Sequence, residues 1–159
     1  MILLFVSGIL AALFVVIAEF GIVSTGLLFG VDLSYWEPSI DGIRQSTFIA
    51  GIILFAIAEE LVKYAVLRKQ LTRIGTQARF LPSITFGVGF IIIELGLLFA
   101  LESNGTGLLA PALGIGAIHL LTSVAYGLIP RTAPAIKRTT ILFVGIGSHA
   151  FYNIFLALI

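Results

Sequence analysis

The chain has 159 residues, of which 59% are hydrophobic and 11% are charged, and its mean hydropathy is +1.16. This composition excludes a water-soluble globular domain and indicates an integral membrane protein. There is no cysteine, which excludes disulfides, thiolate metal sites and a cysteine nucleophile, and the net charge of +1 points to no particular partner.

Five apolar stretches follow one another and predict an all-α fold, a polytopic membrane helical bundle with about five transmembrane helices in the lipid bilayer. The predicted spans are residues 2–29, 46–67, 80–101, 108–129 and 139–159. The last four have the roughly 20 residues that cross a bilayer. The chain shows no linker or internal repeat, so residues 1–159 are predicted to form a single transmembrane domain.

The first span is longer than a bilayer requires and contains Glu19, Gly21, Ser24 and Gly26. These residues predict that it tilts, kinks or ends early. No basic residue precedes its apolar run, so we expect it to remain as a helix and not to be a cleaved signal peptide.

Basic residues concentrate in two loops. The segments Arg68 to Arg79 and Pro130 to Arg138 contain arginine and lysine but no acid. Of the other two loops, one holds the acids Asp32, Glu37 and Asp41 together with Arg44, and the other holds Glu102. Because basic loops stay in the cytoplasm, we predict a cytoplasmic N-terminus and an external C-terminus.

Polar side chains lie inside the predicted spans, where each is energetically costly. They are Glu19, Glu59, Glu60, Lys63, Glu94, His119, His149 and Asn153. Counted from the basic end of each span, five of them on four helices lie roughly 13 to 22 Å deep, namely Glu59, Glu94, His119, His149 and Asn153. This shared depth predicts one common site. Glu19 is isolated in the first span, and for it we expect a structural role.

Spacing within the helices gives orientation. Glu59 and Lys63 are four residues apart, as are His149 and Asn153, so each pair shares a helical face. Glu60 points about 100° away from Glu59, and the spacing does not show which of the two faces the site.

Each polar residue also has a structural interpretation. Glu59 and Lys63 fit an intrahelical ion pair, His119 fits a packed core histidine, and Asn153 fits a hydrogen bond between helices. Glu94 fits a position beside a water-filled cavity. The combination, and no single member, points to chemistry.

A carboxylate and two imidazoles at one depth can activate a water molecule for hydrolysis. Lys63, Asn153 or a protonated histidine can then stabilise an oxyanion. The chain has no HExxH or serine-hydrolase motif, and its glycines follow no nucleotide-binding pattern, so nucleic-acid binding has no support. A non-catalytic membrane scaffold or a small proton-linked transporter would use the same ionisable group.

Four short motifs resemble those of PrsW-type intramembrane proteases, which belong with the CAAX prenyl proteases and bacteriocin-processing enzymes. EELVK at Glu59 resembles the EExxK motif, FIIIE ending at Glu94 the FxxxE motif, and HAFYN from His149 the HxxxN motif. HLLTSVAYG from His119 resembles the remaining histidine motif. The four occur in family order on successive spans, from about Ser46 to Ile159, which leaves the first span unmatched.

The resemblance implies an endopeptidase that cleaves a membrane-anchored protein or peptide, in the cell membrane of a prokaryote. It implies that Glu59 is the base, supported by Glu60, and that His119 and His149 bind or orient the water. Asn153 would assist the oxyanion, and Glu94 and Lys63 would complete the cluster. Both metalloprotease and metal-free glutamate protease mechanisms are implied by relatives, so zinc on His119, His149 and Glu94 stays open.

Overall fold

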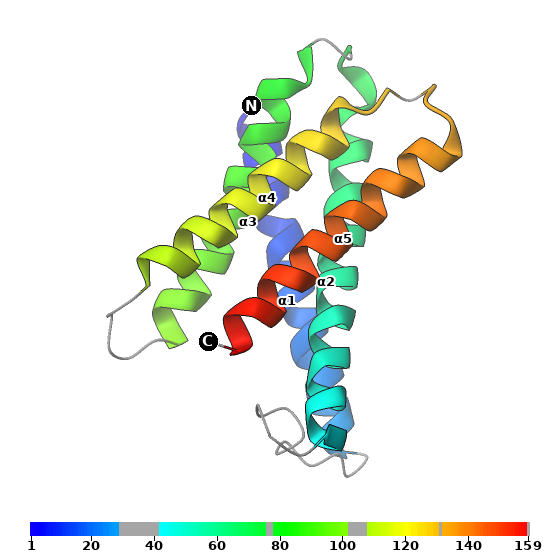
Figure 1. The fold of residues 1–159 in the computed structure, drawn as a ribbon. Coiled ribbons are helices and arrows are strands. Elements are labelled where there is room, and N and C mark those ends of the chain that lie inside the picture. Colours follow the sequence, from blue (N-terminus) through cyan, green and yellow to red (C-terminus); the bar gives the residue numbers. More distant parts are fainter. Residues whose placement is uncertain (29–41, 76–77, 102–107, 131, 159) are drawn as a thin grey trace.

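A computed structural model describes residues 1–28, 42–75, 78–101, 108–130 and 132–158 (Figure 1). These residues form five α-helices and one short 3-10 turn. They are α1 (Ile2–Leu28), α2 (Gly42–Gln70), η2 (Leu71–Arg73), α3 (Phe80–Leu101), α4 (Leu109–Leu128) and α5 (Ala135–Leu158). No strand occurs in the described segments, so the predicted all-α helical bundle is confirmed.

Four helices, α1, α3, α4 and α5, are long and apolar enough to cross a membrane. The integral membrane character of the chain is therefore supported. With 29 residues α2 is also long enough, but its sequence carries Glu59, Glu60 and Lys63 and is not uniformly apolar. That α2 also crosses the bilayer stays a prediction.

The helix ends agree closely with the predicted spans. The main differences are that α2 runs from Gly42 to Gln70, four residues earlier and three later than predicted, and that α5 begins at Ala135, four residues earlier than predicted. α1 runs as one helix through Glu19 and Gly21 to Leu28, so the early end considered for it does not occur. The acids that we used to predict topology, Asp32, Glu37, Asp41 and Glu102, lie outside the described residues.

The helices run up and down, so that the N-terminus, η2 and the start of α5 lie at the same end of the bundle (Figure 1). These are the segments that we predict to be cytoplasmic. α2 packs against α1, α4 and α5, whereas α3 packs against α1 and α4. α1, α4 and α5 therefore surround α2, the helix that carries Glu59, Glu60 and Lys63.

α1 and α3 approach until their backbones touch. A Cβ atom added at Gly8 would collide with the carbonyl oxygen of Phe86, and one added at Gly89 would collide with that of Phe5. Small residues allow this kind of contact between membrane helices. The apolar core beside the crossing consists of Leu4, Ala11, Ala12, Val15, Leu67, Leu71, Phe86, Phe90 and Tyr126.

Candidate functional site

Five of the predicted site residues meet inside the bundle. Their exposed fractions are 6% for Glu59, 0% for Glu60, 0% for Lys63, 1% for His119 and 3% for His149. The first three come from α2, His119 comes from α4 and His149 from α5. The two imidazole rings are perpendicular, with centroids 4.9 Å apart. The common site predicted from depth is therefore present as a side-chain cluster.

Glu60 is the most fully paired member of this cluster. Its Oε1 accepts hydrogen bonds from the Lys63 ammonium at 2.5 Å and from His149 Nδ1 at 2.9 Å. Its Oε2 accepts one from the Tyr126 hydroxyl at 2.6 Å. A buried carboxylate requires such compensation. Glu60 thus joins α2, α4 and α5 and has little capacity left for a reacting group.

Lys63 is bound to a different glutamate from the one that we expected. The spacing of four predicted a pair with Glu59, but the ammonium bonds to Glu60, three residues before it. It also donates to His119 Nδ1 at 2.8 Å and to the Thr122 hydroxyl at 3.2 Å. The reason is the rotation of α2, which turns the edge bearing Glu60 and Lys63 toward α4. All three ammonium protons have acceptors.

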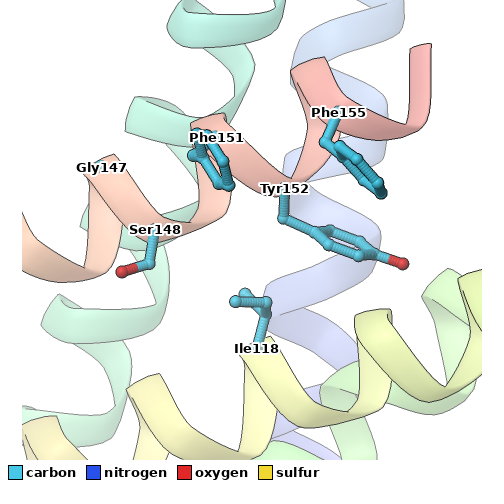
Figure 2. A pocket seen from close by; sticks show the side chains of 6 residues that line it. All are labelled: Ile118, Gly147, Ser148, Phe151, Tyr152 and Phe155. Atoms are coloured by element: carbon cyan, nitrogen blue, oxygen red, sulfur yellow. The ribbon is translucent and has the colours of Figure 1, made fainter. Parts of the chain in front are cut away.

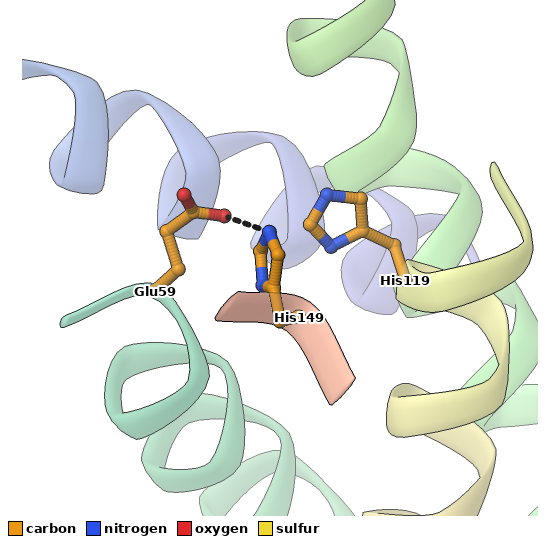
Figure 3. Close-up of side chains that lie close together, drawn as sticks. All are labelled: Glu59, His119 and His149. Atoms are coloured by element: carbon orange, nitrogen blue, oxygen red, sulfur yellow. Dashed lines mark ion pairs between the residues drawn. The ribbon is translucent and has the colours of Figure 1, made fainter. Parts of the chain in front are cut away.

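Glu59 has the opposite environment from Glu60. Its Oε2 atom is buried but has no hydrogen-bond partner. The same atom lies 3.6 Å from Nε2 of His149, beyond direct hydrogen-bond length, and His119 lies on the other side of His149 (Figure 3). Buried carboxylate oxygens are normally satisfied. Glu59 is therefore the glutamate that is free to act on a bound molecule.

The hydrogen-bond network assigns the tautomers of both histidines. His149 donates through Nδ1 to the Glu60 carboxylate, which leaves the Nε2 lone pair facing Glu59. His119 accepts the Lys63 ammonium at Nδ1, so its proton lies on Nε2. The cluster therefore combines two acceptors, Glu59 Oε2 and His149 Nε2, with one donor, His119 Nε2.

Glu59, His119 and His149 also form a group that could hold a metal ion, because each offers one ligand atom and these atoms lie within 4.8 Å of one another. The carboxylate in this set belongs to Glu59 and not to Glu94, on which we had placed a zinc ligand. The set fits zinc poorly, because ligation by His119 Nε2 would move its proton to Nδ1, against the Lys63 ammonium. The donors and acceptors suit a water molecule better.

Three other polar residues surround the cluster. Glu94 on α3 is half-buried and interacts electrostatically with Glu59 and Lys63, and Asn153 is half-buried one turn beyond His149 on α5. Glu19 of α1 interacts electrostatically with Glu59 and Glu94, while its Oε1 is buried without a partner. Contrary to our expectation, Glu19 is therefore not isolated, but its structural role stays a prediction.

Tyr126 and Thr122 belong to the site, although we did not predict them as site residues. Thr122 accepts from Lys63, and Tyr126 donates to Glu60. A signal was present, because His119, Thr122 and Tyr126 follow the spacing of three and seven residues that places side chains on one helical face. Polar residues sharing a face with a membrane histidine point to its partners.

An apolar groove between α4 and α5 runs beside the cluster. One pocket of about 460 Å³ is lined by Ile118, Gly147, Ser148, Phe151, Tyr152 and Phe155 (Figure 2). A second, of about 180 Å³, shares Ile118 and Ser148 and includes Thr122 and Tyr126. The groove therefore reaches side chains that bond directly to Lys63 and Glu60.

Comparison of the chain with protein-family models, with curated proteins and with solved structures gives no match. The four motifs and the side-chain geometry therefore carry the functional argument.

Proposed function

We propose that the protein is an intramembrane endopeptidase that hydrolyses a peptide bond of a membrane-anchored protein or peptide with water activated by Glu59 and His149. The supporting observation is the pair of acceptors Glu59 Oε2 and His149 Nε2, buried and 3.6 Å apart. A water molecule that donates one proton to each would satisfy both atoms. The resemblance of the motifs to PrsW-type proteases agrees with this chemistry.

In the proposed reaction the water oxygen attacks the carbonyl carbon of the scissile bond while Glu59 takes a proton. The tetrahedral oxyanion accepts a hydrogen bond from His119 Nε2, and the Asn153 amide is a second donor on the same side of α5. When the carbon–nitrogen bond breaks, Glu59 returns its proton to the departing amine. The products are a carboxylic acid and an amine, and Glu59 is again ionised.

The surroundings assist each step. Glu60 fixes the His149 tautomer, and Lys63 fixes that of His119. The five clustered residues are buried, so the site is largely shielded from solvent, which strengthens hydrogen bonds to the developing charge. In this proposal no metal is required, and the orientation is that of the charge pattern, with a cytoplasmic N-terminus in the cell membrane of a prokaryote.

The decisive experiment is cleavage of a panel of transmembrane peptides by purified protein, with Glu59→Gln as the central variant. Glutamine keeps the size of the side chain but cannot accept the water proton, so turnover should fall by about 10²- to 10⁴-fold. His149→Ala and His119→Ala should fall comparably, and a Glu59→Gln/His149→Ala double variant should be little worse than either.

Lys137→Gln is the control, because this exposed residue on α5 lies outside the cluster. It should cleave like the parent protein. Undiminished cleavage by Glu59→Gln, or absence of cleavage by the parent on every peptide, would overturn the proposal.

A proton-linked transporter is the second candidate, favoured by one observation. Carboxyl groups from three helices, Glu19, Glu59 and Glu94, interact with one another at the cluster. Interacting carboxyl groups within a membrane are typical of proton paths. Proteoliposomes with a pH gradient across the membrane distinguish the two candidates. A transporter dissipates the gradient, and the Glu19→Gln variant should lose this activity. A protease leaves the gradient intact. A scaffold would show neither activity.

A further inference from the structure

A polar pocket lies between α2 and the first turns of α5, and the ring of its lining residue Tyr64 packs against Tyr126 of the candidate site. It has a volume of about 160 Å³ and is lined by Tyr64, Ala135, Arg138, Thr139 and Leu142. Four of its lining residues belong to the first turns of α5, and that helix begins at the end of the bundle that carries η2 (Figure 1). The candidate reaction uses none of its lining residues.

Arg138 supplies an uncompensated donor at this pocket. Its Nε atom is buried and has no hydrogen-bond partner. Among the residues that the structure describes, Arg138 forms no ion pair with a carboxylate; Glu59 and Glu60 pair with Lys63 and His149 instead. A buried donor without an acceptor is unfavourable, and its presence beside a cavity indicates a missing anionic partner.

A second guanidinium group contacts the ring of Tyr64, which is one of the pocket's lining residues. Arg68 lies over the ring of Tyr64, with 5.8 Å between its Cζ atom and the ring centroid, and donates to the carbonyl oxygen of Ile129. Thr139 adds a hydroxyl group to the lining. Arginine and hydroxyl donors suit the several oxygens of a phosphate group, because a guanidinium donates two parallel hydrogen bonds to it.

We propose that this pocket binds a phosphate group, and that the headgroup of an anionic phospholipid supplies it. The pocket lies at the predicted cytoplasmic end of apolar helices, where headgroup phosphates are found. Leu142 and the Tyr64 ring provide apolar surface beside the donors, on which the glycerol end of a lipid can pack. The bound headgroup would join α2 to α5, the two helices that carry Glu60 and His149.

The test uses the full chain in a zwitterionic detergent and native mass spectrometry to count bound molecules. The probes are dioctanoyl phosphatidylglycerol, dioctanoyl phosphatidylcholine and inorganic phosphate. Arg138→Gln should weaken phosphatidylglycerol binding by about tenfold or more, as expected for a charge-assisted bond. Lys137→Gln removes the same charge from the preceding, exposed residue and should leave binding close to that of the parent.

Two further variants keep the result interpretable if Arg138→Gln does not fold. Ala135→Leu fills the pocket without changing any charge, and Arg138→Lys keeps the charge but removes the Nε donor. Both should weaken phosphatidylglycerol binding. Competition by inorganic phosphate would identify free phosphate as the occupant, and its failure to compete would identify the lipid.

Three results would overturn the proposal. The first is equal loss of binding in Arg138→Gln and Lys137→Gln, which would indicate a diffuse surface-charge effect. The second is equally tight binding of phosphatidylcholine and phosphatidylglycerol in every variant. The third is unchanged phosphatidylglycerol binding by Ala135→Leu and Arg138→Lys. None of these measurements depends on peptide cleavage.

Discussion

The α1–α3 crossing and the α2–α4–α5 cluster hold their helices together by opposite means. At the crossing, Gly8 and Gly89 bring two backbones into contact, and the adjoining core is apolar. In the cluster, charged side chains bridge the helices through Glu60 and Lys63. The first region depends on shape and the second on hydrogen bonding.

The difference shows which interactions a membrane protein can use for stability alone. Glycine contacts associate helices in lipid without burying any charge. The attraction within a buried ion pair rarely exceeds the free energy lost when both charges leave water, so the presence of such a pair indicates a role other than stability. Here the paired residues Glu60 and Lys63 hold in place the two histidines that face Glu59. We place the reaction at Glu59 Oε2, a buried atom without a hydrogen-bond partner beside these histidines.

Among the predicted changes, replacement of Lys63 by alanine should have the largest effect on stability, because it disrupts the cluster. It leaves Glu60 buried without its ammonium partner, which should lower the free energy of unfolding by about 3 to 5 kcal/mol. Detergent-induced unfolding, followed by circular dichroism, measures this change. Lys69→Ala, which removes an exposed lysine from the same helix, is the control and should change little. Equal stability of the two variants would show that the ion pair contributes nothing to folding.

Gly89→Leu tests the other region. Its side chain would meet the backbone of α1 at Phe5, which cannot yield easily, so we expect a loss of about 3 kcal/mol in unfolding free energy. Gly96→Leu on the same helix is the matched control, because nothing lies within 4 Å of an added Cβ there. Protein that remains folded should keep its full cleavage rate. A catalytic loss larger than the loss of folded protein would contradict the separation of the two regions.

The fold was predictable from the sequence because the apolar spans carry it. The four apolar helices, and the convergence of α2, α4 and α5 on a polar layer, follow from hydropathy and depth. Their boundaries moved by about a turn, where terminal residues such as Ala135 continue a helix beyond the apolar stretch.

The side-chain pairing was not predictable, because it depends on how each helix is rotated. Glu59 and Glu60 differ by about 100° around α2, and only packing against α4 decides which one meets Lys63. The same rotation replaces Glu94 by Glu59 beside the histidines. The approach of Glu19 depends on how α1 crosses the bundle, which no spacing within α1 reveals.

Tyr126→Phe sharpens the comparison by removing one hydrogen bond from the cluster without changing its packing. Glu60 would keep its bonds to Lys63 and His149, so the expected loss is about 1.5 kcal/mol of stability, the lower range for a bond to a charged group. The cleavage rate at saturating peptide should fall several-fold while KM stays constant, because Tyr126 acts through Glu60 on the orientation of His149. Tyr64→Phe makes the same change on the ring packed against Tyr126 and should leave the rate unchanged.

Removal of metal should have the smallest effect of all. If Glu59 and His149 hold water directly, dialysis against EDTA should leave peptide cleavage unchanged, and added zinc should not raise it. The reason is the proton on His119 Nε2, which Lys63 enforces by donating to Nδ1 at 2.8 Å. Elemental analysis of the purified protein is the independent measurement and should give far less than one zinc per chain. Loss of cleavage on chelation, restored by stoichiometric zinc, would show that His119 changes tautomer and that the cluster is a metal centre.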